Sequence, residues 1–353
     1  MTLKDLRLKI DGIDERIVQL LNDRAKLSQA IGQNKLRDGQ AVYAPHREKE
    51  VLDFIRKNNQ GPLTPAALQA IYCEIMSSSL ALEKSLRVAT LGTAGSFTSI
   101  AARKKFGSQI EYVDCRSVWE VFRRVAQADC DYGVVPIENS TEGAVTHTFD
   151  ALLETELKIC SQVLVKVSHC LCAKTEFGNI KKIYSNPQVF GQCRNWLQNH
   201  LAAAQQIPVA TNTEAVALAA KEKNAAAIAS QEAAKLYAVP VLRRDIQDIA
   251  HNTTRFLILG QQDAQPTGSD KTSILFSVKD KVGALYHMLK PFYDQKINLT
   301  KIESRPSKKK AWEYNFFVDF AGHRLDPKVQ KALAKLEPMC QYLKVLGSYP
   351  VVE

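Results

Sequence analysis

The chain has 353 residues, of which 45% are hydrophobic and 24% are charged, and a formal net charge of +10 at pH 7. A globular chain of this length predicts two to three domains, and no apolar run reaches the roughly 20 residues of a membrane span. The charge favours anionic partners, but no arginine-rich run is interleaved with aromatic residues, which argues against nucleic acid and for small carboxylates or phosphates.

Residues 1–9 are charged and amphipathic, unlike a secretory signal, so we expect a cytoplasmic protein that does not bind membranes. The eight cysteines lack the paired CxxC spacing of a zinc site, and a chain this large needs no disulfides. We therefore expect reduced thiols, and neither a metal nor another cofactor.

The first predicted element is one long helix with a cationic gap in its apolar stripe. The stripe consists of Leu3, Leu6, Ile10, Ile13, Ile17, Leu20, Leu27 and Ile31, which follow one another in steps of three and four apart from the gap. Arg24 fills the gap, and Lys35 follows about 16 Å along the same face. A charge on an apolar seam needs a partner, so we expect these two cations to close on one small dianion. Arg7 lies roughly 25 Å before Arg24, so it could reach that ligand only from a second, antiparallel chain of an interlocked dimer.

Two further helices carry polar groups on or beside their apolar seams. One begins near Pro45 and carries Arg47. The other spans residues 65–86 and carries Ser79, with Glu83 one turn later. A coiled coil whose long side chains snorkel to solvent is the alternative for any one of these groups. Five such groups on three helices favour a ligand pocket.

Four segments of this region resemble the all-helical chorismate mutase domain. They are LRLKIDGID (6–14), LNDRAKL (21–27), IGQNK (31–35) and YAPHRE (43–48). The resemblance implies a pocket lined by Arg24, Lys35, Arg47, Glu48, Ser79 and Glu83, with Arg7 from the partner chain. It also implies that Arg24, Lys35 and Glu83 are catalytic, with Lys35 and Glu83 facing the breaking ether oxygen, since a pericyclic rearrangement needs a cationic cage and no nucleophile. Ala44 replaces an acidic residue of some members, and Glu83 is glutamine in others.

An α/β pattern begins at residue 87. Residues 87–91 predict a short strand, and a glycine turn leads from it into a helix that ends near residue 106. Gly92, Gly95, Ser96 and Thr98 suit an anion seat at the start of that helix. The turn lacks the GxGxxG fingerprint of dinucleotide binding, so we expect no NAD site.

The stretch DYGVVPIENSTEGAV (131–145) predicts a buried strand over 132–137, a polar loop and then a helix over 144–153. Glu138, Asn139, Ser140 and Thr141 make up the loop. Ligands of open α/β sheets bind at the carboxyl ends of strands, so this loop is a candidate binding site. An ordinary connecting loop is the alternative.

Strand and helix patterns alternate onward to residue 259, which predicts two α/β lobes. Residues 252–256 are expected to return into the cleft between the lobes, as the wall opposite residues 131–145. His169 lies on an apolar run and is expected to be a buried core histidine.

Four of these segments, LGTAGSFT, PIENSTEG, YSNPQVFGQC and NTTRF, together resemble prephenate dehydratase. The resemblance implies that Thr254 donates a hydrogen bond or a proton to the leaving hydroxyl, and that Arg255 either holds a substrate carboxylate or is structural. The other residues that it places in the substrate site are Glu138, Asn139, Ser140, Thr141, Ser185, Gln188, Asn252 and Phe256. Thr93 replaces the proline that usually follows the first glycine.

Residues 261–270 are polar and turn-rich and predict a linker. The patterns that follow, including a strand over 313–320, fit a ferredoxin-like βαββαβ sandwich. VGALYHML and KIESRP resemble the ACT domain, which implies a phenylalanine site formed by Gly283, Ala284, Leu285, Glu303, Ser304, Arg305 and Pro306. A dimerisation module without a ligand is the alternative.

The order of these units resembles the bifunctional chorismate mutase/prephenate dehydratase family. We therefore expect a multidomain fold: an all-α helical bundle (1–86), a two-lobed α/β domain like those of periplasmic binding proteins (87–261) and an α+β ACT domain (271–353). The expected partners are chorismate and prephenate as substrates, phenylalanine as effector, and further copies of the chain in a homodimer or tetramer. A two-lobed anion-binding protein with a sensory module is the non-enzymatic alternative, but it would not need Arg24, Lys35 and Arg47.

Overall fold

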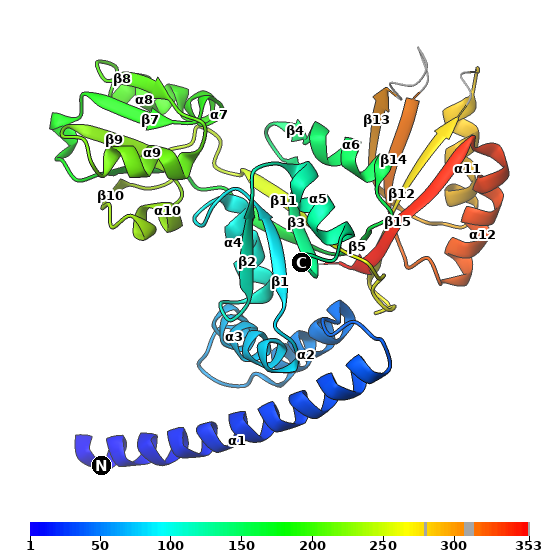
Figure 1. The fold of residues 1–353 in the computed structure, drawn as a ribbon, viewed down its shortest axis with the longest axis horizontal. Coiled ribbons are helices and arrows are strands. Elements are labelled where there is room, and N and C mark those ends of the chain that lie inside the picture. The colour runs from blue at the N-terminus through cyan, green and yellow to red at the C-terminus, as the bar shows by residue number, and fades with distance from the viewer. Residues whose placement is uncertain (279–280, 307–313, 352–353) are drawn as a thin grey trace.

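The structure, a computed structural model, describes residues 1–278, 281–306 and 314–351. Three helices come first, two α/β lobes follow, and an α+β sandwich ends the chain (Figure 1). The predicted multidomain fold class is confirmed. Among the described residues, none of the helices combines the length and the apolar character needed to span a membrane.

The helical unit consists of α1 (Leu3–Arg37), α2 (Pro45–Asn58) and α3 (Pro65–Glu83). Thr2 and Asp5 form a capping box at the start of α1, and a proline opens each of the other two helices, where its missing N–H is not needed. The first half of α1 extends away from the rest of the molecule (Figure 1). Its apolar stripe is therefore uncovered: Leu6 is 44%, Ile10 55% and Ile13 54% exposed.

Helix α3 ends three residues earlier than the sequence predicts. Lys84 follows Glu83 in an extended conformation, and its Nζ lies 2.5 Å from Asp131 Oδ1 in the first α/β lobe. Leu86, which is 2% exposed, already packs in the core of that lobe. Burial of Leu86 in the neighbouring domain explains why the helical pattern does not continue to residue 86.

The first lobe is a mixed sheet in the order β2-β1-β3-β11-β5, with β4 paired to β3. Its elements are β1 (Arg87–Leu91), α4 (Phe97–Phe106), β2 (Glu111–Cys115), α5 (Val118–Ala126), β3 (Tyr132–Asn139), β4 (Gly143–Ala144), α6 (Thr146–Glu154), β5 (Lys158–Lys166) and β11 (Thr253–Gly260). Strand β1 is parallel to β2 and β3, whereas β11 is antiparallel to β3 and β5. Because Gly143 and Ala144 pair with β3, α6 begins two residues later than predicted.

Strand β3 is longer than predicted and has an unexpected neighbour. The sequence predicts its end at residue 137, but Glu138 and Asn139 continue it and pair with Arg255 and Thr254 of β11. Pro136 is accommodated because the register of β11 shifts just after Arg255. The prediction of opposite walls is therefore wrong: residues 252–256 lie beside residues 131–145 in one sheet.

The second lobe has the strand order β10-β6-β9-β7-β8. Its elements are β6 (Cys170–Ala173), η1 (Phe177–Asn179), β7 (Lys182–Ser185), α7 (Pro187–Gln192), α8 (Arg194–His200), β8 (Gln205–Pro208), α9 (Asn212–Ala219), β9 (Ala225–Ala229), α10 (Gln231–Leu236) and β10 (Val241–Arg243). The chain crosses between the lobes twice, at residues 167–169 and 244–252. Two crossings in a two-lobed α/β unit leave a cleft between the lobes for a ligand.

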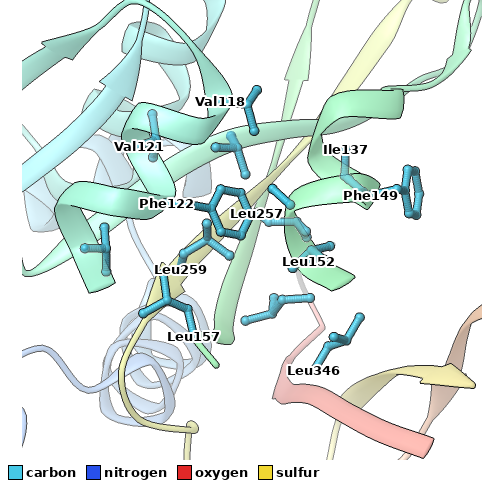
Figure 2. Packing of buried hydrophobic residues seen from close by; sticks show 14 of the residues in the cluster. Val118, Val121, Phe122, Ile137, Phe149, Leu152, Leu157, Leu257, Leu259 and Leu346 are labelled. Carbon is cyan, nitrogen blue, oxygen red and sulfur yellow. The ribbon is translucent and has the colours of Figure 1, made fainter. Parts of the chain in front are cut away.

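The C-terminal sandwich has the strand order β13-β14-β12-β15. Its elements are β12 (Asp270–Val278), α11 (Ala284–Asp294), β13 (Leu299–Pro306), β14 (Tyr314–Ala321), α12 (Pro327–Leu336), η2 (Glu337–Met339) and β15 (Tyr342–Pro350). Phe276 and Phe320 pack with the helices, whereas Phe317 and Leu346 belong to a core shared with the first lobe. Figure 2 shows Leu346 in the same cluster as Leu152. The predicted strand start at residue 313 lies outside the described residues.

Candidate active sites

A cavity of about 260 Å³ lies between α1, α2, α3 and the end of α4. Six of the seven residues predicted for the mutase pocket line it: Arg24, Lys35, Arg47, Glu48, Ser79 and Glu83. Three separate helices thus bring the charged seam positions to one place. Ala44 also lines the cavity, so no carboxylate is present at that position.

The two cations of α1 are held at the cavity by α3 and by the α1–α2 connection. Arg24 Nη1 donates to Ser79 Oγ at 2.5 Å, and Ser79 in turn donates to the Ile75 carbonyl at 2.9 Å. Lys35 Nζ donates to the Val42 carbonyl at 2.6 Å and lies 3.7 Å from Glu83 Oε2. These contacts fix both cations before a ligand arrives, which is the arrangement that stabilises charge developing in a transition state.

Glu83 is an unusual carboxyl group in this cavity. Burial raises its pKa above the ordinary value, although the charges of Lys35 and Arg24 act in the opposite direction. Oε2 is buried and has no hydrogen-bond partner among the described residues. A Cβ on Gly32 would lie 2.7 Å from Glu83 Cβ, so the glycine allows α1 to approach α3 closely at this point. Burial thus shifts the protonation equilibrium of Glu83 towards the neutral form, relative to a carboxyl group in water.

Arg7 does not line this cavity. It lies on the exposed half of α1, seventeen residues before Arg24 and hence about 25 Å away along the helix. Arg47 lines the cavity but is itself exposed, and its Nη1 pairs with Glu50 at 2.7 Å. Within one chain the cationic cage is therefore open on the side towards solvent.

A second cavity, of about 540 Å³, lies between the two α/β lobes. Four of the ten residues predicted for the dehydratase site line it: Asn139, Gln188, Thr254 and Phe256. No lysine or arginine is among the described residues that line it. An anion in this cavity would be held by amides, hydroxyls and helix amino termini instead of by side-chain cations.

Asn139 and Thr254 form the polar centre of this cavity. Asn139 Oδ1 accepts hydrogen bonds from the amides of Thr141 and Glu142 and from the Thr141 hydroxyl. Its Nδ2 therefore points the other way and donates to Thr254 Oγ1 at 2.8 Å and to Asn252 Oδ1 at 2.6 Å. Because the Thr254 oxygen already accepts this bond, its own hydrogen is available to a ligand.

Four other predicted residues support the cavity without lining it. Thr141 fixes Asn139, and Asn252, which is 1% exposed, accepts from it. Ser140 Oγ bonds the backbone of His251 and Thr253, across the strand pair. Ser185 is buried behind the lining residues, and its hydroxyl donates to the Ile228 carbonyl at 2.8 Å.

Contrary to the prediction, Arg255 and Glu138 do not line the cavity between the lobes. Side chains alternate along a strand, so Glu138 and Arg255, the immediate neighbours of Asn139 and Thr254, lie on the opposite face of the sheet. Arg255 pairs with Glu138 at 3.0 Å and with Asp319 of the C-terminal sandwich at 2.6 Å. Its Nη2 donates to Tyr349 Oη at 2.7 Å. These contacts make Arg255 a buried link between two domains and favour the structural alternative.

Among the lining residues that sequence reasoning missed, Glu142, His169 and Gln192 form one hydrogen-bonded chain. His169 Nε2 lies 2.7 Å from Gln192 Oε1, and Gln192 Nε2 donates to Glu142 Oε1 at 3.0 Å, from one lobe to the other. Burial lowers the pKa of His169, so the ring is neutral near pH 7. The expected burial is observed, with 1% exposure, but the ring also lines the cavity. Its position in a segment that crosses between the lobes was the available signal.

The lobes also meet at the amino termini of their helices. Ser230, the cap of α10, donates to the Gly95 carbonyl at 2.7 Å. Gly95 has φ +88°, and a Cβ there would lie 2.9 Å from Ala233 Cα, so only glycine fits this contact. The first turns of α4 and α9, with Thr98 and Thr213, line the cavity. Two helix amino termini thus face the space between the lobes.

The residues predicted to bind phenylalanine lie at two places on the C-terminal sandwich. Gly283, with φ +76°, caps α11, and Ala284 and Leu285 begin that helix. Residues 303–306 end β13, which is the edge strand of the sheet. An edge strand leaves backbone groups unpaired and suits an interface with another chain.

The chain matches three families in order along its length. These are described as Chorismate mutase type II (residues 6–84), Prephenate dehydratase (88–264) and ACT domain (272–338). It is 46% identical over 353 residues to the bifunctional chorismate mutase/prephenate dehydratase of Aquifex aeolicus, with 99% of this chain and 98% of the relative covered. It is 44% identical over 355 residues to the Pseudomonas aeruginosa protein of the same description, with 99% and 97% covered. The crystal structure of prephenate dehydratase from Arthrobacter aurescens in complex with L-Phe is 32% identical, with a TM-score of 0.70, and covers 75% of this chain and 90% of that chain.

Proposed function

We propose, from the premise that this chain belongs to the bifunctional chorismate mutase/prephenate dehydratase family, that its two cavities are the two active sites and that phenylalanine regulates the second. The enzyme has both activities: it rearranges chorismate to prephenate, and it converts prephenate to phenylpyruvate. The observation that carries the assignment of sites is the contrast between them. One cavity is lined by cations and the other by hydroxyls and amides.

In the helical cavity, Arg24 and Lys35 hold the two carboxylates of chorismate and keep the substrate compact. The rearrangement breaks a carbon–oxygen bond and forms a carbon–carbon bond in one step, so the protein supplies position and charge and no covalent chemistry. Negative charge grows on the ether oxygen as the bond breaks. Lys35 and a neutral Glu83, 3.7 Å apart, are the donors that stabilise it.

We expect the mutase rate to rise as pH falls towards the raised pKa of Glu83. Burial raises that pKa, and only the protonated carboxyl can donate to the ether oxygen. Its fraction falls about tenfold per pH unit above the pKa. Glu83→Gln keeps a donor at every pH, so kcat/KM for chorismate should lose this dependence. The profile is measured for both proteins, and an identical slope in Glu83→Gln contradicts the role.

The exposed stripe of α1 supports an interlocked homodimer that completes the mutase pocket. An apolar surface of this kind is rarely left open in solution. An antiparallel second chain would cover it and bring its Arg7 to the open side of the cage. Light scattering should give twice the mass of one chain, and Ile10→Glu with Ile17→Glu should give monomers that lose mutase activity and keep dehydratase activity. A wild-type monomer with full mutase activity rules this arrangement out.

In the cleft, prephenate loses its ring hydroxyl as water and its ring carboxylate as carbon dioxide. The electron pair of the breaking carbon–carbon bond enters the ring as the hydroxyl leaves with a proton, so one donor to that oxygen suffices. Thr254, whose oxygen already accepts from Asn139 at 2.8 Å, is this donor. The amino termini of α4 and α9 receive the two carboxylates, since the described residues of the lining include no lysine or arginine.

Phenylalanine inhibits the dehydratase through the ACT domain. The support is the L-Phe bound in the related Arthrobacter aurescens structure and the placement of residues 303–306 on an edge strand. Inhibition requires that phenylalanine bind one arrangement of the domains more tightly than another. The Arg255 network, which joins β11 to the ACT sheet, is the contact through which such a difference would reach Thr254.

The assay that tests the whole proposal supplies chorismate to the purified chain and follows prephenate and phenylpyruvate by chromatography, with and without phenylalanine. Prephenate should appear first and phenylpyruvate second, and phenylalanine should slow only the second step. Binding of phenylalanine without a change in dehydratase rate contradicts the regulatory part alone. We also propose the domain limits 1–86, 87–261 and 271–353. A cytoplasmic location is proposed as well, and the unpaired state of all eight cysteines supports it.

A further inference from the structure

We infer that the dehydratase domain supplies a positioning residue, Lys105, to the mutase site, where it acts through Glu48. The inference rests on the proposed function of the helical cavity. It adds to that cavity a cation from the C-terminal end of α4, beyond the helical domain. The segments that resemble chorismate mutase contain no counterpart of this residue.

The contact between the two residues is close and largely buried. Lys105 Nζ lies 2.7 Å from Glu48 Oε2, and the two side chains are 12% and 14% exposed. Tyr43 Oη donates to the same oxygen at 2.8 Å. The Tyr43 ring packs on Phe106, the last residue of α4, with ring centroids 4.9 Å apart, and Lys105 Nζ lies 5.9 Å from the Tyr43 ring centroid. Both ends of the pair are thus held by packing between the domains.

The charges in the cavity give this pair a function. Arg24, Lys35, Arg47 and Lys105 are four cations, and Glu48 and Glu83 are two carboxylates, on the lining contributed by one chain. With Glu48 ionised and Glu83 neutral, as proposed for catalysis, the net charge is +3, an excess of positive charge that suits a dicarboxylate substrate. Without Lys105, the Glu48 carboxylate would face the substrate carboxylates with less compensation and would repel them.

The geometry also leaves one oxygen of Glu48 for the substrate. Tyr43 and Lys105 both bind Oε2, and among the described residues no hydrogen bond to Oε1 is recorded. Chorismate carries a hydroxyl as well as its two carboxylates, and a carboxylate oxygen is an acceptor for it. Lys105 therefore sets the direction in which Glu48 presents Oε1. Ala44 offers no carboxylate nearby, so this chain depends on Glu48 for that contact.

Helix α4 also provides an internal control for the experiment. Its first residues, Phe97 and Thr98, line the dehydratase cavity, and its last two line the mutase cavity. A substitution that displaced α4 would therefore change the kinetics of both reactions. A substitution that acts only through Glu48 would change the mutase reaction alone.

The experiment measures both reactions on the full-length chain with Lys105→Ala, Lys105→Arg and Lys104→Ala. Lys105→Ala should raise KM for chorismate about tenfold, with a smaller change in kcat, because the positive charge that compensates the Glu48 carboxylate is lost. Lys105→Arg should restore KM to within about twofold. Lys104, whose Nζ donates to the Leu164 carbonyl, is the matched control and should change neither reaction. KM for prephenate should stay constant in all three variants.

A cycle with Glu48→Gln separates positioning from a direct role. If Lys105 acts through Glu48, Lys105→Ala should add little to the effect of Glu48→Gln. Full additivity, an unchanged KM for chorismate in Lys105→Ala, or an equal change in both reactions would each overturn the inference. Wild-type chain that does not rearrange chorismate would instead overturn the proposed function, so the two failures are distinguishable.

Discussion

Thr254→Ala is expected to abolish phenylpyruvate formation while chorismate is still converted to prephenate. The substitution removes the hydroxyl that we propose as donor to the leaving oxygen, and loss of a positioned proton donor costs about 10²–10⁴-fold in rate. Thr254 is 8% exposed in the cleft, on a lobe apart from the helical cavity. Prephenate should therefore accumulate when chorismate is supplied, and the rate of its formation should equal that of the wild type.

Two further variants separate the hydroxyl from the shape of the side chain. Thr254→Ser keeps the hydroxyl that accepts from Asn139 and should keep most of the dehydratase activity. Thr254→Val has the same shape without the hydroxyl and should behave like Thr254→Ala. Full dehydratase activity in Thr254→Val refutes the donor role. Loss of both reactions in Thr254→Ala would indicate a folding defect, which thermal unfolding of the same sample would reveal.

The mutase pocket could be predicted from the sequence because helical spacing is regular. A cation in a heptad gap, followed eleven residues later by a second cation, must lie on the same face of a continuous helix. The structure accordingly brings Arg24 and Lys35 to one cavity. Lys105 could not be found in this way, because it comes from another domain and no local spacing relates it to Glu48.

The dehydratase site was less predictable, because the pairing of distant strands decides which side chains reach it. Asn139 and Thr254 meet only because β11 pairs with β3 in a register that sets residue 254 opposite residue 139. A slip of β11 by one residue would have turned Arg255 into the cavity in place of Thr254. The residues of the cleft can be identified in the sequence, but the register that pairs β11 with β3 cannot be predicted from it. The sequence therefore left open which of the polar side chains face the substrate.

Asp319→Ala is expected to destabilise the protein and to impair the dehydratase, although Asp319 lies on β14 of the C-terminal sandwich and does not line the cleft. It would leave the Arg255 guanidinium, 7% exposed, without one of its two carboxylate partners. Removing one member of a buried ion pair costs about 3–5 kcal/mol, because the remaining charge is uncompensated. Arg255 is adjacent to Thr254 on β11, so a change in this link should also displace the proposed proton donor.

Glu138 limits how far the remaining network can compensate. Burial opposes its ionisation, but hydrogen bonds from Lys301 and Arg255 outweigh this and hold the pKa of Glu138 below its ordinary value. A lowered carboxyl pKa contributes stability that is present above the ordinary pKa and is lost as pH falls through the lowered one. Glu138 is therefore ionised at neutral pH, where it already serves both Arg255 and Lys301. It cannot neutralise Arg255 fully when Asp319 is removed.

The measurements for Asp319→Ala are urea unfolding at pH 7, dehydratase kinetics and the response to phenylalanine. Stability and dehydratase kcat/KM should fall, while mutase activity should remain. The matched control is Asp294→Ala, which breaks the 2.8 Å pair with Lys290 on α11 of the same domain. That pair is solvent-exposed, so its loss should cost no more than about 0.5 kcal/mol. If Asp319→Ala behaves like Asp294→Ala, the buried network neither stabilises the domain contact nor positions Thr254, and phenylalanine must act on the cleft by another route.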